Sequence, residues 1–503
     1  MTSLRTQPLV SFGVPVYNGE LHLEASVRSL QTQTWSNLEI LISDNASTDG
    51  TEAICRRLAA SDPRIRYLRQ PVNLGAAGNF DLVAREARGA LFAWCAHDDL
   101  HLPRFVEACA AELERRPDAV VCNPAVAFLD EEGRIRPDWK DSNFETRSST
   151  RPERAQRLID HVDWVDVYGL VRRDALLAAL PYEPIFGSDV VLTMRLLMLG
   201  EFAKVQETLF HYRVRPLHQR TDQMRQERVR NARPYTGMIR ALLSVAMQAA
   251  ADHAERAELL RRFLRTLTDL GREGPHASWR GLLGQEHRAA LGADPARETF
   301  PRHLLGWLAE GLPGPAGGRE ALALVLADAR RALIAVPGHA EDLERVPALV
   351  SALRARLPRA TFGVLCPEPC AARLSGADGL EAVLPFAPLP DAASGPSRDR
   401  DPELARVRDF GADLVFCPST RRTLRMDKLA TRSGALLGFT FHQPAIDRSR
   451  WYRRRTPYDP NRHWGFVLPG RGEVAELMAF LDRADPCAEA PRSNDTLCSS
   501  GRP

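Results

Sequence analysis

Residues 11–51 read SFGVPVYNGELHLEASVRSLQTQTWSNLEILISDNASTDGT, and this stretch decides the fold. Apolar runs at 9–16 and 38–44 have the length and composition of buried strands, and the segment between them has the apolar spacing of a helix. Three further strand candidates continue the alternation, at 64–70, 90–96 and 119–128. Because strand and helix alternate, the sequence predicts an α/β domain with a parallel sheet, whose ligands lie beyond the carboxyl ends of the strands.

Polar residues and glycines follow each of these predicted strands. The strand-end residues suited to holding a ligand are Pro15, Tyr17, Asp44, Asn73, Gly75, Asp98 and Asp99. Adjacent carboxylates such as Asp98 and Asp99 supply oxygen ligands for a hard divalent cation, which would neutralise phosphate oxygens. An Asp-Asp pair taken alone is more often a turn or a helix cap, so the hypothesis depends on the order of all these motifs together.

Composition and charge exclude several classes of protein. The 67 basic and 64 acidic residues nearly cancel to a net charge of +3, so no global field attracts nucleic acid or anionic lipid. Nine cysteines occur without a CxxC pair, which favours a reducing cytoplasm over a disulfide framework or a zinc site. The sequence has neither a signal peptide nor a long apolar run, so we expect a cytoplasmic protein with at most peripheral contact at the inner face of the membrane.

The motifs occur in an order that resembles a known family. The opening stretch is followed by NLGAAGN at 73–79 and by a strand leading into HDDLHLP at 97–103. Over residues 8–216 the chain resembles the inverting family 2 glycosyltransferases, which have the GT-A fold. The resemblance implies an α/β, Rossmann-like domain that binds a nucleotide-sugar, with UDP- or dTDP-sugar as the expected donor.

The resemblance also implies roles for the strand-end residues. The residues that it places against the donor nucleotide are Pro15, Tyr17, Glu20, Asp44, Asn45 and Asn73, with Asp44 at the base. It places Asp98 and Asp99 at a Mg²⁺ or Mn²⁺ ion that bridges the donor diphosphate. The family usually has Asp-x-Asp at this site, whereas this chain has Ala96 in the first position. One carboxylate is therefore missing, and this departure leaves the affinity and the identity of the metal open.

Two later segments resemble the family's catalytic and closing motifs. FGSDVVLTMRLLMLGEF at 186–202 places Asp189 where the catalytic base lies, and a base is needed because a sugar hydroxyl is a poor nucleophile until it loses its proton. The alternative is that Asp189 only caps the helix that begins at Val190. LFHYRVRP at 209–216 places Arg213, and Arg215 in place of a histidine, where either could contact the leaving diphosphate.

The second half of the chain carries a weaker resemblance of its own. Residues 332–480 resemble the amino-terminal Rossmann-like half of heptosyltransferase-type, GT-B, family 9 enzymes, with Glu341 in the place of the catalytic aspartate. Too few residues follow for a second nucleotide-binding half, so we expect a non-catalytic or acceptor-binding domain, or a purely structural one. Arginines and aromatic residues cluster at 448–455, where a solvated loop is the commoner interpretation than a phosphate-binding patch.

A chain of 503 residues is longer than one core usually organises, so we predict several domains. They are a GT-A glycosyltransferase domain at 1–230, a helical connector and linker at 231–318, a second Rossmann-like α/β domain at 319–485 and a disordered tail at 486–503.

The expected function follows from these hypotheses. We predict a metal-assisted, inverting glycosyltransferase that moves a sugar from a nucleotide-diphosphate-sugar to a hydroxyl of a glycan, a lipid-linked glycan or a protein, in the synthesis of surface polysaccharide or glycoconjugate. A catalytically silent nucleotide- or carbohydrate-binding scaffold is the alternative. A nucleotidyltransferase would share the strand-end acids, but the glycine-rich phosphate loop of that class is not found near the amino terminus.

Overall fold

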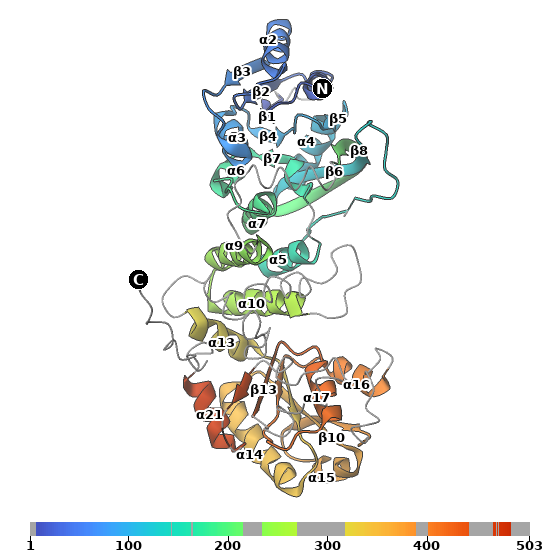
Figure 1. Ribbon diagram of the computed structural model, residues 1–503, viewed down its shortest axis with the longest axis vertical. Helices are drawn as coiled ribbons and strands as arrows, with labels where there is room; N and C mark the ends of the chain where they lie inside the picture. Colours follow the sequence, from blue (N-terminus) through green and yellow to red (C-terminus); the bar gives the residue numbers. More distant parts are fainter. Residues whose placement is uncertain are drawn as a thin grey trace, which may run out of the picture. The chain divides into compact units, whose positions relative to one another are not determined.

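The chain forms two compact units, Met1–Ala249 and Ala250–Pro503, which are described one at a time (Figure 1). The computed structural model describes residues 7–141, 143–161, 164–214, 234–268, 317–388, 401–441, 466–468, 470 and 472–483.

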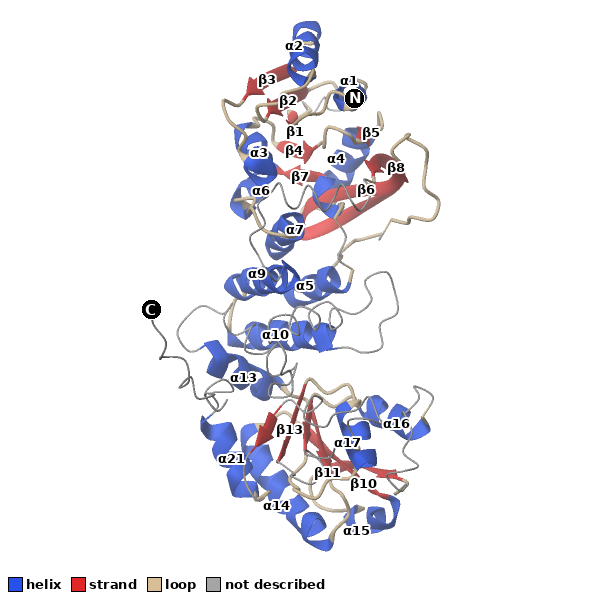
Figure 2. Cartoon of the chain, viewed as in Figure 1, coloured by secondary structure: helices blue, strands red, loops and turns tan. Residues whose placement is uncertain are grey.

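The first unit contains an eight-stranded sheet with the order β3-β2-β1-β4-β7-β6-β8-β5 (Figure 2). Its strands are β1 (Val10–Val16), β2 (Leu38–Asp44), β3 (Ile65–Arg69), β4 (Leu91–Trp94), β5 (Leu100–His101), β6 (Ala119–Leu129), β7 (Leu170–Arg172) and β8 (Glu201–Arg213). The predicted α/β class and the five predicted strands of the amino-terminal half are confirmed. Every residue of β1 and β2 is buried, which explains their continuous apolar character, since central strands of such a sheet are covered on both faces.

The prediction of a purely parallel sheet is wrong in its details. β7 runs antiparallel to both β4 and β6, and β5 runs antiparallel to β8. Both strands are very short, two or three residues long, so neither gives a periodic apolar pattern from which direction could be deduced. β8 begins at Glu201, before the motif at 209–216, and pairs in parallel with β6 along almost its whole length.

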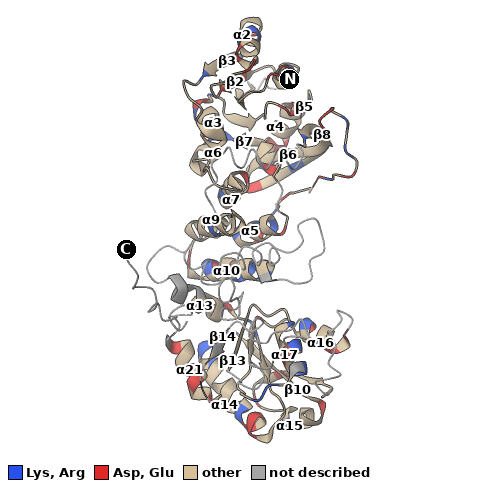
Figure 3. Cartoon of the chain, viewed as in Figure 1, with Lys and Arg blue, Asp and Glu red and all other residues tan. Residues whose placement is uncertain are grey.

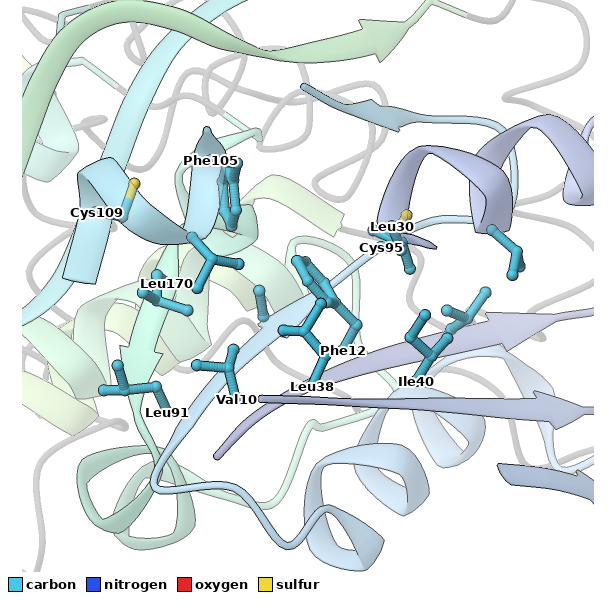
Figure 4. Packing of buried hydrophobic residues seen from close by; sticks show 14 of the residues in the cluster. Val10, Phe12, Leu30, Leu38, Ile40, Leu91, Cys95, Phe105, Cys109 and Leu170 are labelled. Carbon is cyan, nitrogen blue, oxygen red and sulfur yellow. The ribbon is translucent and has the colours of Figure 1, made fainter. Parts of the chain in front are cut away.

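Helices cover the first sheet and complete its core. They are α1 (Leu23–Gln31), α2 (Thr51–Ser61), α3 (Gly75–Glu86), α4 (Phe105–Arg115), α5 (Arg151–Asp160), η1 (Asp166–Tyr168, a 3-10 helix), α6 (Arg173–Ala179), α7 (Ser188–Leu199) and α9 (Pro234–Ala249). Phe12 of β1 and Phe105 of α4 are fully buried in one apolar cluster, to which α1 adds Leu30 (Figure 4). Gly13 of β1 has no room for a side chain, because a Cβ there would collide with the ring of Phe92.

Helix α9 belongs to the first unit, although its residues fall within the predicted connector. It contacts α7 and α5, and it buries an apolar face consisting of Met238, Ile239, Leu242, Leu243, Ala246 and Met247. The division between the two units therefore falls after Ala249, whereas the predicted boundary is at residue 230.

The second unit contains a six-stranded sheet with the order β11-β10-β9-β12-β13-β14. Its strands are β9 (Arg331–Ala335), β10 (Thr361–Pro367), β11 (Leu380–Phe386), β12 (Leu414–Phe416), β13 (Leu437–Phe441) and β14 (Phe466–Leu468). Its neighbouring strands pair in parallel. This order is that of a doubly wound Rossmann-like sheet, so the predicted class of the second domain is confirmed. The resemblance to heptosyltransferases stays a prediction.

The helices described in the second unit are α10 (His253–Thr268), α13 (Gly317–Asp328), α14 (Ala340–Arg356), η2 (Glu368–Cys370, a 3-10 helix), α15 (Ala371–Leu374), α16 (Pro402–Phe410), α17 (Leu424–Thr431) and α21 (Val474–Arg483). Among the helices described, none is long and apolar enough to cross a membrane. Basic and acidic side chains are interspersed over the helices of each unit (Figure 3). The predicted tail at 486–503 and the arginine-rich cluster at 448–455 lie outside the described residues.

Candidate active site

The loops that follow β1 and β2 are bonded to each other. The backbone N–H of Asn18 donates to Ser47 Oγ at 2.9 Å, and that of Gly19 donates to Thr51 Oγ1 at 2.8 Å. The Glu20 carboxylate accepts from the backbone N–H of Gly50 at 2.7 Å, at the start of α2. Glu20, which the resemblance places against the nucleoside, therefore joins the two loops into one rigid edge.

Two other residues expected at the nucleoside lie on the same strand end. Pro15 is buried within β1 and pairs with Ser43 of β2, whereas the Tyr17 side chain is 40% exposed just beyond the strand. Of the two, Tyr17 is the residue whose side chain reaches the surface, and Pro15 shapes the backbone beneath it.

Asp44 lies fully buried at the end of β2 and is held by three donors. Its Oδ1 accepts from the Ser47 backbone N–H at 2.8 Å. Its Oδ2 accepts from the Tyr67 hydroxyl at 3.0 Å and from Arg69 Nη1 at 2.5 Å. Burial and the nearby Asp44 carboxylate raise the pKa of Tyr67 to about 12, so this hydroxyl stays protonated and donates.

Arg69 is a candidate site residue that sequence reasoning missed. It ends β3 directly opposite Asp44 in the parallel register, and its guanidinium also donates to the Ser47 carbonyl at 3.0 Å. Its side chain is 33% exposed, while that of Asp44 is fully buried. A ligand beyond this sheet edge therefore meets Arg69 before Asp44. The position of an arginine at the end of the third predicted strand was the signal that could have found it.

Asn45 and Asn73 hold the third loop against the second. Asn45 Nδ2 donates to Asn73 Oδ1 at 3.0 Å, and Asn45 Oδ1 accepts from the backbone N–H of Leu74 at 2.8 Å. Asn73 Oδ1 also accepts from the backbone N–H of Gly75, where α3 begins with a positive φ of 78°. The described contacts of both amides are thus within the protein, and they fix the loop that leads into α3.

Asp98 and Asp99 lie buried just beyond β4, and Arg213 binds the same turn. Asp99 Oδ1 accepts from the backbone N–H of Arg213 at 2.8 Å, and the Asp98 carbonyl accepts from Arg213 Nε at 3.1 Å. Arg213 Nη1 donates to the carbonyls of Asp130 and Glu131, each at 2.9 Å. Arg213 therefore ties the Asp-Asp turn to the end of β6. Arg215, its expected companion, lies outside the described residues.

The two carboxylates at this turn suit a metal ion that takes most of its ligands from substrate and water. Among the residues that the structure describes, no group of three or more His, Cys, Asp and Glu side chains could hold an ion. Asp98 and Asp99 supply carboxylate oxygens only, and one oxygen of Asp99 already accepts a backbone hydrogen bond. Mg²⁺ and Mn²⁺ sites of the substrate-bridging kind use one or two protein carboxylates, completed by phosphate oxygens and water. The pair is suited to such a site.

Asp189 lies in the first turn of α7, after a loop whose conformation requires glycine at position 187. Gly187 has a φ of 73°, and a Cβ there would collide with the side chain of Met238 on α9. Asp189 Oδ1 accepts from the backbone N–H of Val190 at 3.0 Å, a contact at the start of the helix. Asp189 as a whole residue is partly exposed.

Tyr168 links the Asp-Asp turn to Asp189. Burial raises the pKa of the Tyr168 hydroxyl well above its ordinary value. The nearby groups Tyr212, Asp99, Tyr182 and Asp189 add to the shift. The 3-10 helix η1, which ends at Tyr168, contacts α7, and the Tyr168 ring packs on that of Tyr212, the neighbour of Arg213. Helix η1 therefore contacts the helix that carries the expected base and the strand that binds the Asp-Asp turn.

The basic pair that follows Tyr168 has structural partners. Arg172 donates to the carbonyls of Ala119 and Leu113 at 2.9 and 2.8 Å, and Arg173 donates to the carbonyl of Arg85 at 3.3 Å. These contacts hold β7 and α6 against neighbouring elements.

Comparison with known proteins finds a family model that matches part of the amino-terminal unit. Residues 11–177 match the family model described as Glycosyl transferase family 2. The putative glycosyltransferase EpsH of Bacillus subtilis (strain 168) is 35% identical over 124 residues, which are 24% of this chain and 36% of EpsH. The chondroitin synthase of Escherichia coli is 31% identical over 133 residues, which are 26% of this chain and 19% of that protein.

An uncharacterized glycosyltransferase of Rickettsia typhi is 34% identical over 100 residues, which are 20% of this chain and 30% of that protein. The chain thus spans well under half the length of these curated relatives. The crystal structure of S. aureus TarS 1-349 in complex with UDP has a TM-score of 0.42 and 16% identity, covering 63% of this chain and 83% of that one. The assignment depends on the family match and on the curated relatives. Residues 11–177 of this chain are thus similar to glycosyl transferase family 2.

Proposed function

We propose that the amino-terminal unit transfers a sugar from a nucleotide-diphosphate-sugar to a hydroxyl group, with inversion at the anomeric carbon. The observation that carries the proposal is the packing around η1. This helix contacts α7, which carries Asp189, and its Tyr168 packs on Tyr212 with ring centroids 6.1 Å apart. The residue after Tyr212, Arg213, donates its backbone N–H to Asp99. These contacts support one site that contains an acid suited to a diphosphate-bound cation and an acid suited to proton transfer. A binding protein would have no need of the second acid.

In this mechanism Asp189 accepts the proton of the acceptor hydroxyl as that oxygen attacks the anomeric carbon. The bond to the diphosphate breaks on the opposite side, so the displacement is in line and inverts the configuration. Arg69, supported by buried Asp44, is placed to contact the nucleoside at the end of β3. A Mg²⁺ or Mn²⁺ ion held by Asp98 and Asp99 would supply positive charge that stabilises the leaving diphosphate.

The proposal extends to substrate and location. A UDP-sugar is the expected donor, and polysaccharide synthesis is the expected setting, a view that the similarity to the Escherichia coli chondroitin synthase supports. All seven cysteines among the described residues are free, including Cys366 and Cys370, which supports work in the reducing cytoplasm. Peripheral contact with the membrane remains part of the same proposal.

The experiment compares Asp189→Asn with Asp174→Asn. Asp174 makes the same contact as Asp189, accepting from the backbone N–H of the next residue, Ala175, at 2.8 Å in the first turn of α6. The matched control therefore removes the same helix-terminal carboxylate without touching the site. The measurement is Mn²⁺-dependent hydrolysis of a panel of nucleotide-sugars, in which water replaces the acceptor.

We expect Asp189→Asn to lower hydrolysis about 10²- to 10⁴-fold while UDP binding stays unchanged, because a base acts in the chemical step and not in donor binding. Asp174→Asn should keep the wild-type rate. Full activity in Asp189→Asn would show that this residue only caps α7.

A silent nucleotide-binding scaffold is the second candidate, and the small set of acids at the Asp98–Asp99 turn favours it. It predicts UDP binding that does not depend on Mn²⁺ and no hydrolysis of any donor. The same panel of nucleotide-sugars distinguishes the two candidates, since thermal stabilisation by UDP alone reports binding without turnover.

A further inference from the structure

Three aromatic side chains from separate elements meet beside the loop that carries Asp189. The rings of Trp164 and Phe186 have centroids 5.6 Å apart, and those of Phe186 and Tyr235 have centroids 5.0 Å apart. Both pairs are edge-to-face, with interplanar angles of 66° and 72°. Trp164, Phe186 and Tyr235 are called the aromatic patch below.

The aromatic patch differs from the aromatic core of the same unit. Phe12, Phe105 and Trp94 are fully buried, whereas all three members of the patch remain partly exposed. Exposing the face of a large aromatic ring to water is unfavourable. A group of three partly exposed rings is therefore not explained by packing of the core alone. The patch therefore offers apolar ring surface to something outside the chain.

The aromatic patch lies close in the fold to the expected base. Trp164 lies two residues before the 3-10 helix η1, and Phe186 lies three residues before Asp189 in the loop that leads into α7. Trp164 contacts Phe186, and η1 contacts α7. The patch is thus next to the first turn of the helix that carries Asp189.

Helix α9 fixes this arrangement. Tyr235 in its first turn packs on Phe186, and Met238 one turn later fills the space beside Gly187. Both contacts come from a helix beyond the part of the chain that matches the family model, which ends at residue 177. Of the three patch residues, Phe186 and Tyr235 therefore lie outside the matched residues and Trp164 lies inside them.

We propose that the aromatic patch binds a sugar ring of the acceptor and so makes a glycan, free or lipid-linked, the acceptor class. A pyranose ring has an apolar C–H face that packs on an aromatic ring and a hydroxyl rim that the Trp N–H and Tyr O–H can bond. A sugar held on the patch presents its hydroxyl to Asp189, as proton transfer requires. A serine or threonine side chain of a protein acceptor would leave the patch uncovered. The proposal rests on the function proposed above.

The test measures binding of chito-, cello-, malto- and chondroitin oligosaccharides by calorimetry, with UDP and Mn²⁺ present. Trp164→Ala and Tyr235→Ala are compared with Trp139→Ala, which removes a tryptophan that is 39% exposed in the same unit and that packs on Phe128 instead, at 5.5 Å. We expect the wild type to bind at least one oligosaccharide class, and both patch variants to bind it about tenfold or more weakly. Trp139→Ala should bind like the wild type.

Two further measurements keep the outcomes distinct. Trp164→Phe and Tyr235→Phe retain an aromatic face and should recover most of the affinity, which also covers the case in which an alanine variant fails to fold. UDP binding in the wild type tests the proposed function separately, because that proposal assigns the nucleoside to the strand ends around Arg69 and not to the patch. Absence of oligosaccharide binding in the wild type, or equal affinity in the patch variants, would overturn the aromatic patch as an acceptor site even if UDP binds.

Discussion

At the scale of single residues, a buried and an exposed Arg–carboxylate pair are expected to contribute very differently to stability. Arg69 pairs with fully buried Asp44, whereas Arg28 pairs with Glu24 on the surface of α1, where the two side chains are 65% and 36% exposed. Removing one partner of a buried pair leaves a charge without compensation, while an exposed pair is replaced by water.

We therefore expect Arg69→Met to lower the free energy of unfolding by about 3 kcal/mol and to weaken UDP binding. Arg28→Met should lower it by about 1 kcal/mol or less, and should leave UDP binding intact. Urea-induced unfolding of the full chain measures the first effect, and calorimetric titration with UDP measures the second. Equal urea midpoints for the two variants would count against an anchoring role for Asp44.

Asp62 gives the first unit a defined dependence on pH. Hydrogen bonds from the Arg64 side chain, supported by one from Gln31 at 3.0 Å, hold the pKa of Asp62 well below its ordinary value of 3.8. Because the folded state keeps this carboxylate charged longer than the unfolded state does, its contribution to stability is complete above the ordinary pKa. The contribution is lost as pH falls toward the folded pKa.

The prediction is that Asp62→Asn is less stable than the wild type at neutral pH and that the difference shrinks between about pH 4 and about pH 3. Thermal unfolding midpoints of both proteins across this range check it. A difference that stays constant with pH would mean that the carboxylate contributes through shape and not through charge.

At the scale of elements, the loop between α6 and α7 depends on a helix far along the chain. Gly187 needs glycine twice, for its positive φ of 73° and for the close approach of Met238. Gly376 in the second unit has a similar φ of 81° but no heavy atom within 4 Å of where a Cβ would lie. Substitutions at the two glycines therefore distinguish the effect of backbone strain from the effect of steric crowding.

We expect Gly187→Ala to reduce donor hydrolysis at least about tenfold with unchanged UDP binding, because displaced Asp189 no longer meets the nucleophile. Gly376→Ala should cost only about 1 kcal/mol of stability and no activity. Adding Met238→Ala to Gly187→Ala should restore part of the rate by making room. The measurement is the rate of donor hydrolysis of the three variants. Full activity in Gly187→Ala would show that α9 does not position the base.

The pattern of the sequence predicts elements well where they are long and regular. The expected spacing of Leu23, Val27 and Leu30 gives α1, whose apolar face is buried as predicted. The same pattern cannot predict β7, because three residues carry no period and its antiparallel direction is set by pairing with β4 and β6. A short strand whose direction is set by pairing can be predicted only when its neighbouring strands are known.

At the scale of the whole molecule, the position of the boundary between the units has a measurable consequence. A fragment of residues 1–249 contains α9, whereas a fragment ending at the sequence-based boundary, residue 230, lacks it. Without α9 the faces of α7 and α5 that it contacts are open to water. We expect the shorter fragment to unfold at a midpoint at least about 5 °C lower and to lose most donor hydrolysis.

Calorimetry and the nucleotide-sugar panel, applied to both fragments and to the full chain, measure these differences. The fragment 1–249 should retain UDP binding. Equal midpoints for the two fragments would show that α9 is a connector after all, and not part of the first unit.

The sequence by itself determined the class of both units, most of their strands and the set of acids at the strand ends, because apolar periodicity and strand-end position are local properties of the chain. Only the tertiary structure decided which of those residues face one another. It joined Asp44 to Arg69 across two strands, η1 to the helix that carries Asp189, and α9 to the loop that precedes the expected base. Such contacts depend on sheet register and helix packing between distant segments, which no local pattern encodes.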